Sequence, residues 1–193
     1  MKALLAHIKP GGVYRRSDLE YYSSAIDRHL AQLVAEGSLV KLAQGLYHAP
    51  KNTKFGAIPP GDDEIVARFL NDDDFLIVSP NDYNMLGLGL TQLYNTVWVY
   101  NHKRKGVFLF NGCAFDFKIK SKYPRQITTE FLFVDLMNNL DLIAEDVPYI
   151  LKLARERLTN MDQNAIIKMA QRYGSVKTRK ILKGILIEKF RDA

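Results

Sequence analysis

The sequence predicts an α+β protein made of two modules. Its 193 residues are 47% hydrophobic, 25% charged and 11% aromatic, a composition typical of folded globular chains, which excludes a disordered or fibrous protein. Apolar residues at helical spacing occur near both ends of the chain. Short apolar or alternating runs typical of strands occur next to the N-terminal helices and in the middle of the chain. The length fits one domain or two small domains, and we expect two.

The number of cysteines and the length of the apolar stretches predict the cellular compartment and whether the protein contacts a membrane. The single cysteine, Cys113, cannot form an internal disulfide, and a zinc site would need several histidines beside it. The first eight residues are too short and too interrupted for a signal peptide, and no stretch approaches the roughly 20 apolar residues of a membrane-spanning helix. We therefore expect a cytoplasmic protein with no membrane partner.

The net charge of +6 is unevenly distributed. Residues 1–55 carry 8 basic and 4 acidic side chains, residues 56–147 carry 8 and 13, and residues 148–193 carry 11 and 4. Two basic ends around an acidic middle suggest two kinds of partner, and basic ends favour nucleic-acid binding. A solvated helical face is the alternative interpretation of the C-terminal charge.

The N-terminal stretch predicts two helices in succession. After a short extended piece, Ser17 and Asp18 supply an N-cap and a first-turn acid for a helix that runs to about Tyr22. Ser23 and Ser24 are expected to cap the next helix, which ends at Gly37. Its buried stripe is Ile26, Leu30, Leu33 and Val34.

Two short strands follow, at 39–42 and 45–48, with Gly45 in the turn. Helix, helix and hairpin predict a winged helix-turn-helix over residues 1–55, in which the second helix enters the DNA major groove and the hairpin tip reaches phosphates. A protein-docking module is the alternative. The expected DNA contacts are Arg15, Arg16, Tyr22, Ser23, Ser24, Arg28, Gln32, Lys41 and Gln44.

Residues 56–193 predict an α+β domain. The clearest linker is Lys51–Pro60, with a boundary near residue 55. Beyond it we expect a helix to Leu70, a strand at 75–79 and a helix ending at a glycine turn within 81–93. Strands at 96–100, 106–110 and 113–120 predict an antiparallel meander, because Asn111-Gly112 is a strong hairpin signal.

Three C-terminal helices complete the prediction. One begins at Val147-Pro148, one begins at 160–162 and ends at Gly174, and Ser175 caps the last, whose apolar stripe includes Phe190. Together they form a basic helical segment. Such a surface binds either DNA or an acidic protein, and the sequence does not choose between them.

Catalytic patterns are weak throughout the chain. Asp82 with Asp116 and Lys118 resembles the acids and lysine of metal-dependent nucleases, but alternation explains Asp116 and Lys118 as outward positions of a strand. Gly87 and Gly89 lack the rest of a phosphate loop. We therefore expect a non-enzyme without catalytic residues, metal or cofactor, and the nuclease remains the least favoured alternative.

Several short motifs together resemble the AbiEi-like antitoxins of type IV toxin-antitoxin systems. They are the stretches Gly12–Asp18, Gly45–Tyr47, Asn84–Thr91, Ala170–Gly174 and Thr178–Leu182. The resemblance implies a winged-helix transcriptional regulator that represses its own operon and neutralises a nucleotidyltransferase toxin. The expected partners are double-stranded DNA of its own promoter, that cognate toxin, and a second copy of the chain on paired half-sites.

Overall fold

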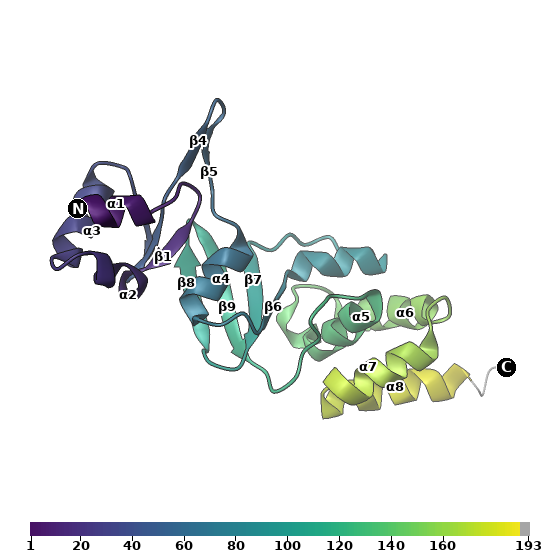
Figure 1. Cartoon of the computed structure of the whole chain (residues 1–193). Helices are drawn as coiled ribbons and strands as arrows, with labels where there is room; N and C mark the ends of the chain where they lie inside the picture. Colours follow the sequence, from purple (N-terminus) through teal and green to yellow (C-terminus); the bar gives the residue numbers. More distant parts are fainter. Residues whose placement is uncertain (190–193) are drawn as a thin grey trace. The chain divides into compact units, whose positions relative to one another are not determined.

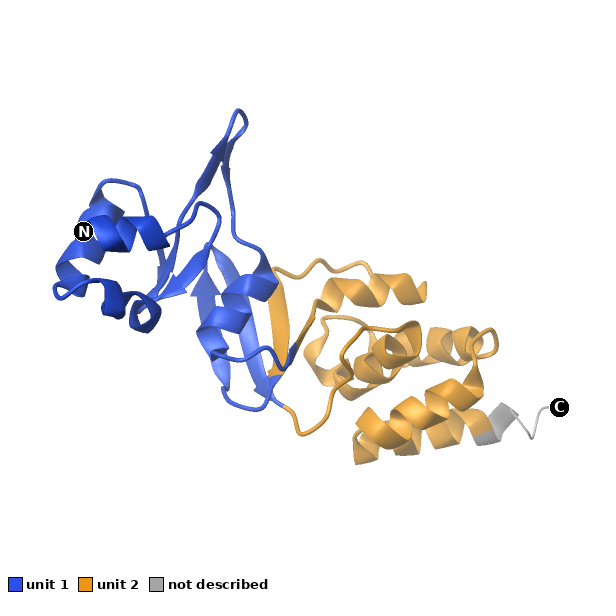
Figure 2. Ribbon diagram, viewed as in Figure 1, with its two compact units in different colours: residues 1–75, 101–119 blue, residues 76–100, 120–193 orange. Residues whose placement is uncertain are grey.

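The computed structural model describes residues 1–189, with side chains up to residue 186, so the predicted apolar position Phe190 lies outside the described residues. Helices and strands are mixed, and the α+β class is confirmed. The described chain forms two compact units (Figure 2). One contains residues 1–75 and 101–119, and the other contains residues 76–100 and the chain from 120 onward. The predicted boundary near residue 55 falls inside the first unit.

The first unit begins with helices packed on a small sheet (Figure 1). The sheet is antiparallel, and β3 lies between β1 and β2. In chain order the elements are α1 (Lys2–His7), β1 (Val13–Arg15), α2 (Arg16–Leu19), the 3-10 helix η1 (Glu20–Tyr22), α3 (Ile26–Ala35), β2 (Val40–Ala43) and β3 (Leu46–His48). Their shared core is Leu4, Leu19, Ile26, Leu30, Leu33, Leu39 and Ala49.

Both predicted serine caps of these helices are wrong. The N-cap of α2 is Arg15, whose backbone N–H donates to the Asp18 carboxylate (3.2 Å). The N-cap of α3 is Ala25, because the Ser23 hydroxyl instead accepts from the Ala25 N–H (3.2 Å) and closes the turn before the helix. The predicted glycine end of α3 is confirmed, since Gly37 has φ +73°.

The stretch predicted as a linker forms a β-hairpin instead. Strands β4 (Lys51–Thr53) and β5 (Gly56–Ile58) pair antiparallel, so a two-residue loop joins them (Figure 1). The Thr53 hydroxyl donates to the Gly56 carbonyl (2.8 Å) and accepts from the Phe55 N–H (3.2 Å). These hydrogen bonds satisfy the backbone at the tip, which a flexible linker would leave to water.

Helix α4 (Asp62–Leu70) joins the sheet to the rest of the first unit. The Glu64 carboxylate accepts from the Val13 backbone N–H in β1 (2.9 Å). The Phe69 ring packs on a second hairpin at centroid distances of 4.7 to 5.2 Å from three of its rings. Those rings are Phe108, Phe110 and Phe117.

That second hairpin consists of β8 (Gly106–Phe110) and β9 (Cys113–Ile119). Its predicted turn is confirmed, since both Asn111 and Gly112 have positive φ, at 50° and 82°. The predicted meander is wrong, because β8 pairs with β9 alone among the described strands and is not a neighbour of β7. The connection into β8 is not a tight hairpin turn: the Asn101 side chain accepts from the N–H groups of Lys103 and Arg104.

The second unit is mostly helical. Strands β6 (Phe75–Val78) and β7 (Thr96–Asn101) are neighbours in one sheet. The predicted C-terminal helices are confirmed, and α5 was not predicted. The helical elements are η2 (Pro80–Leu86), α5 (Thr129–Asn138), η3 (Leu140–Leu142), α6 (Val147–Leu158), α7 (Gln163–Tyr173) and α8 (Val176–Lys189).

The core of this unit surrounds α5, in which every residue from Phe131 to Met137 is buried. Side chains from β6, η2 and β7 pack with residues of α5 to α8 in one cluster. Across the described residues, no helix is both long enough and apolar enough to cross a membrane.

Candidate nucleic-acid interface

Helix α3 has one buried face and one solvent-exposed face. Ile26, Leu30 and Leu33 are buried at helical spacing and fix the helix to the core of the first unit. The exposed face carries a single Lys or Arg, which is Arg28. The remaining exposed positions of the helix are Asp27, Ala31, Gln32 and Ala35.

Arg16 is held in an ion-pair network at the start of α3. Its guanidinium donates to both oxygens of Asp27 (2.6 and 2.8 Å) and to Glu20 (2.6 Å). The hydrogen bond to Asp27 is the largest cause of the raised pKa of Arg16, and the same bond lowers the pKa of Asp27. The network joins α2, η1 and α3, and it balances the Arg16 charge locally.

Arg15 is also paired inside the molecule. Its guanidinium hydrogen-bonds both oxygens of Asp18, three residues further on. The bond raises the pKa of Arg15 and lowers that of Asp18. Arg15 and Arg16 therefore act first as structural cations, and their charge is largely balanced before any partner approaches.

Arg28, by contrast, is exposed, and its guanidinium makes no ion pair or hydrogen bond within the described part of the chain. At the turn between β2 and β3, the exposed Lys41 ammonium donates to the side-chain carbonyl of exposed Gln44 (3.0 Å). A neutral amide leaves the Lys41 charge uncompensated. Gln32 donates to Glu36 one helical turn away (2.8 Å) and is exposed.

The residues just before α3 divide between internal and exposed positions. The Tyr22 ring stacks on His7 with centroids 4.0 Å apart and packs against the core. Ser23 Oγ lies 2.7 Å from His29 Nδ1. Desolvation, with the nearby positive charges of the N-terminus and Arg28, lowers the pKa of His29. Ser24 is exposed.

The predicted contact residues thus separate into two groups. Arg15, Arg16, Tyr22 and Ser23 are held in contacts within the first unit. An exposed set remains available to a partner: Ser24, Arg28, Gln32, Lys41 and Gln44.

Sequence reasoning did not include the β4–β5 hairpin, whose exposed residues carry Lys51, Lys54 and Phe55. One signal for it was available: no Asp or Glu occurs between Glu36 and Asp62. The charged side chains of residues 51–58 are therefore two lysines alone, Lys51 and Lys54, and positive charge without nearby acid in the sequence favours a polyanionic partner.

The residues of the nuclease hypothesis have structural partners. The Asp82 carboxylate accepts from the Ser79 N–H (2.9 Å) and closes the start of η2. On β9, a carboxylate oxygen of Asp116 lies 3.6 Å from the Lys118 ammonium nitrogen. In the described residues, no group of three or more His, Cys, Asp or Glu side chains is arranged to hold a metal ion.

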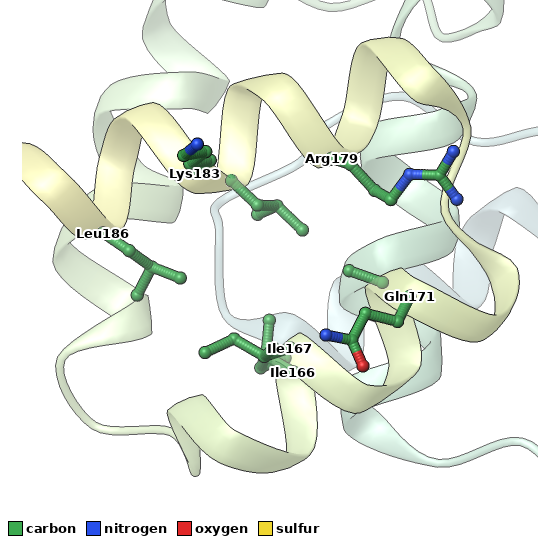
Figure 3. A pocket seen from close by; sticks show the side chains of 8 residues that line it. Ile166, Ile167, Gln171, Arg179, Lys183 and Leu186 are labelled. Atoms are coloured by element: carbon green, nitrogen blue, oxygen red, sulfur yellow. The ribbon is translucent and has the colours of Figure 1, made fainter.

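A second candidate surface lies in the second unit, between α7 and α8 (Figure 3). It is a groove of about 320 Å³ with an apolar floor. Arg179 and Lys183 lie one turn apart on α8, and both side chains are exposed. The other lining residues are Ile166, Ile167, Ala170, Gln171, Leu182 and Leu186.

Neither models of protein families nor curated protein sequences give a match to the chain. We therefore infer the function from the geometry of these two surfaces and from the sequence motifs.

Proposed function

We propose that the chain is a DNA-binding transcriptional repressor of its own promoter and the antitoxin of an operon whose toxin is a nucleotidyltransferase. The order α2, α3, β2, β3 supports a winged helix-turn-helix in the first unit. In that arrangement α3 enters the major groove, and the β2–β3 turn reaches the flanking phosphates.

The observation that carries the proposal is the exposed, uncompensated Arg28 on α3. A guanidinium without an internal partner is free to form a bidentate contact with a guanine edge or a phosphate. The exposed Lys41 of β2 is hydrogen-bonded to the exposed Gln44 in the β2–β3 turn, where a wing contacts the DNA backbone. Ser24 and Gln32 supply further hydrogen-bonding groups around α3.

The internal pairs of Arg15 and Arg16 support the same proposal in a different way. The Arg16 network connects α2 with the first turn of α3. A recognition helix held by its neighbours loses less conformational entropy on binding. In this account Arg16 positions α3, and Arg28 contacts the DNA.

The test is binding of the full chain to the DNA immediately upstream of its own gene, measured by fluorescence anisotropy beside a scrambled duplex. We expect tighter binding to the upstream DNA. The affinity should fall as salt rises from about 50 to about 200 mM, with log K decreasing by roughly 0.9 per phosphate contact for each log unit of salt. Equal affinity for both duplexes contradicts the repressor, and absence of binding to either contradicts DNA binding altogether.

The groove between α7 and α8 favours the antitoxin part of the proposal. Its apolar floor and the two exposed cations beside it suit a protein partner with an acidic, partly apolar surface. Co-expression of this chain with the proposed nucleotidyltransferase toxin should restore the growth that the toxin alone stops. The variant Ile167→Asp, which places a carboxylate in the groove, should abolish that rescue. Rescue by the variant at the wild-type level contradicts this use of the groove.

A winged helix can also act only as a protein-docking module. Charge reversal at Arg28 separates this alternative from the repressor. Loss of both repression and upstream-DNA binding in Arg28→Glu supports the DNA-binding repressor. Repression retained by a protein that binds neither duplex identifies the docking module.

A further inference from the structure

The β4–β5 hairpin exposes an aromatic ring at its tip. All six of its strand residues are exposed, and Phe55 in the connecting loop is fully exposed, at 101%. A bare phenyl ring at the end of a narrow hairpin has no structural role within the described part of the chain. Close to the tip the strands carry only small side chains at Thr53, Gly56 and Ala57, so the ring is accessible from several sides.

The hairpin follows β3 in the chain, and β3 belongs to the sheet that carries the proposed DNA interface. At its base, His48 Nε2 in β3 lies 3.3 Å from the Ile58 carbonyl oxygen in β5. The Ala49 carbonyl accepts from the Gly11 N–H (2.6 Å), and the Ala49 N–H donates to the Gly12 carbonyl (2.9 Å). The hairpin forms a separate two-stranded sheet, separated from β3 by two residues of the chain, and the His48–Ile58 contact joins its base to β3 within the first unit.

The tip is ordered by its own hydrogen bonds as well. Thr53 Oγ1 binds both the Gly56 carbonyl and the Phe55 N–H. Gly56 adopts φ +112°, a conformation that favours glycine, and thereby lets the chain reverse after a two-residue loop. A partner that meets the tip meets a preformed shape, so little ordering entropy opposes contact.

The charge around the ring selects the kind of partner. Lys54 is next to Phe55 in the loop, and Lys51 lies at the base of the hairpin, opposite Ile58. Neither ammonium has an ion-pair partner within the described residues. No acidic side chain occurs from residue 37 to residue 61. A purely basic surface attracts a polyanion. Duplex DNA also offers a place for the ring, because apolar side chains can wedge between base steps from the minor groove and bend the helix.

We propose that the β4–β5 hairpin is a second DNA contact, in which Phe55 inserts between base pairs from the minor groove. Lys54 binds the phosphates beside the inserted ring, and Lys51 binds a phosphate nearer the base of the hairpin. The inference rests on the proposed function, since it requires that the first unit binds duplex DNA. It adds a contact outside α3 and the β2–β3 turn, and it assigns the protein an ability to bend its operator.

The experiment measures affinity and bending on the same upstream duplex, carrying a donor dye at one end and an acceptor dye at the other. Wild type, Phe55→Ala, Phe55→Leu and Leu93→Ala are compared. Leucine retains an apolar wedge. Leu93 is the matched control, because it is another highly exposed apolar residue, on the second unit. Thermal unfolding of each variant checks the fold, which a fully exposed Phe55 should not affect.

We expect wild-type binding to shorten the end-to-end distance, consistent with a bend of roughly 20 to 90°. Phe55→Ala should bind about tenfold more weakly and leave the duplex straight. Phe55→Leu should retain most of the bend, and Leu93→Ala should behave as wild type.

Three outcomes overturn the inference, and they are distinguishable. In the first outcome, wild type binds the upstream duplex tightly but does not bend it, and Phe55→Ala binds with the same affinity. This outcome excludes the hairpin contact and leaves the proposed function intact. No wild-type binding to any duplex removes both proposals. Phe55-dependent binding to vesicles of anionic phospholipid, with DNA binding independent of Phe55, assigns the hairpin to a membrane surface instead.

Discussion

The two units use polar networks in opposite ways. In the first unit the guanidinium of Arg16 bridges Glu20 and Asp27 on the exposed surface. In the second unit Asp135 is only 1% exposed, and its carboxylate accepts from the hydroxyls of Tyr83 (2.8 Å) and Tyr100 (2.9 Å). Water can replace the partners of the first network, but it cannot reach those of the second.

A fourth residue, Asn139, belongs to the buried network. The Asn139 amide donates to the Tyr83 hydroxyl (3.2 Å), to the Tyr100 hydroxyl (3.1 Å) and to the Asp135 backbone carbonyl (2.8 Å). A buried charge is tolerated when hydrogen bonds replace its hydration, and it becomes costly when one of them is lost. The comparison indicates that the buried network stabilises the second unit, whereas the surface network of the first unit positions a helix.

The largest effect is expected from Asp135→Ala. The substitution leaves two tyrosine hydroxyls without their acceptor. Because each unsatisfied buried donor costs about 1–3 kcal/mol, the substitution should lower the free energy of unfolding by about 2–6 kcal/mol. Urea titration measures the change. Asp141→Ala is the control, because Asp141 is exposed and pairs with Lys177 on the surface (2.7 Å). An equally small loss of unfolding free energy in both variants would show that the buried network stabilises the protein no more than a surface ion pair does.

Tyr83→Phe should have a smaller effect, of about 1.5–3 kcal/mol. It removes the hydroxyl that donates to Asp135 and accepts from Asn139, but it leaves Tyr100 bound to Asp135 and the ring packed. Urea titration again measures it. Loss of the Tyr83 hydroxyl without any change in stability would show that the contact with Asp135 does not stabilise the unit.

Tyr83 also predicts a pH dependence. Burial, together with the charge of Asp135, raises the pKa of Tyr83 well above its usual value of 10. The folded phenol stays protonated where the unfolded phenol ionises. The contribution of Tyr83 to stability is therefore complete below pH 10 and declines above it. Unfolding from about pH 8 to about pH 11 should show a shallower decline in Tyr83→Phe than in wild type; equal slopes would contradict this assignment.

Arg16→Gln should have the smallest effect on stability. The pairs with Glu20 and Asp27 are solvent-exposed, and exposed ion pairs contribute little. We expect no resolvable change in the urea midpoint, but weaker binding to the upstream DNA, because α3 is held less firmly. A large loss of stability would place the Arg16 network in the same class as the buried one.

The sequence was informative where an element has two different faces. The stripe of Ile26, Leu30 and Leu33 predicted α3, and the Asn111-Gly112 pair predicted the turn between β8 and β9. Helix α5 was missed because Phe131–Met137 is buried on every side. Such a helix has no polar face, so its 3.6-residue period leaves no mark in the sequence.

The same reasoning explains what was missed at the candidate site. Strands β4 and β5 are exposed on both faces, so no alternation distinguished them from a linker. The sequence predicts Arg16 as a DNA contact, since nothing in it indicates an internal partner for the guanidinium. That partner, Asp27, is eleven residues away and comes beside Arg16 only after α2 and α3 have folded. Arg28 was predicted correctly as exposed, since it lies opposite the apolar stripe.

The most direct test of the central claim compares Arg28→Ala with Lys105→Ala on the upstream duplex and on scrambled DNA. Both side chains are exposed cations of the first unit, but Lys105 lies outside α3, the β2–β3 hairpin and the β4–β5 hairpin. We expect Arg28→Ala to lose about 1–3 kcal/mol of binding free energy on the upstream duplex, and to lose less on scrambled DNA. Lys105→Ala should bind both as wild type does. Equal binding of wild type and Arg28→Ala to both duplexes would contradict recognition of DNA by α3.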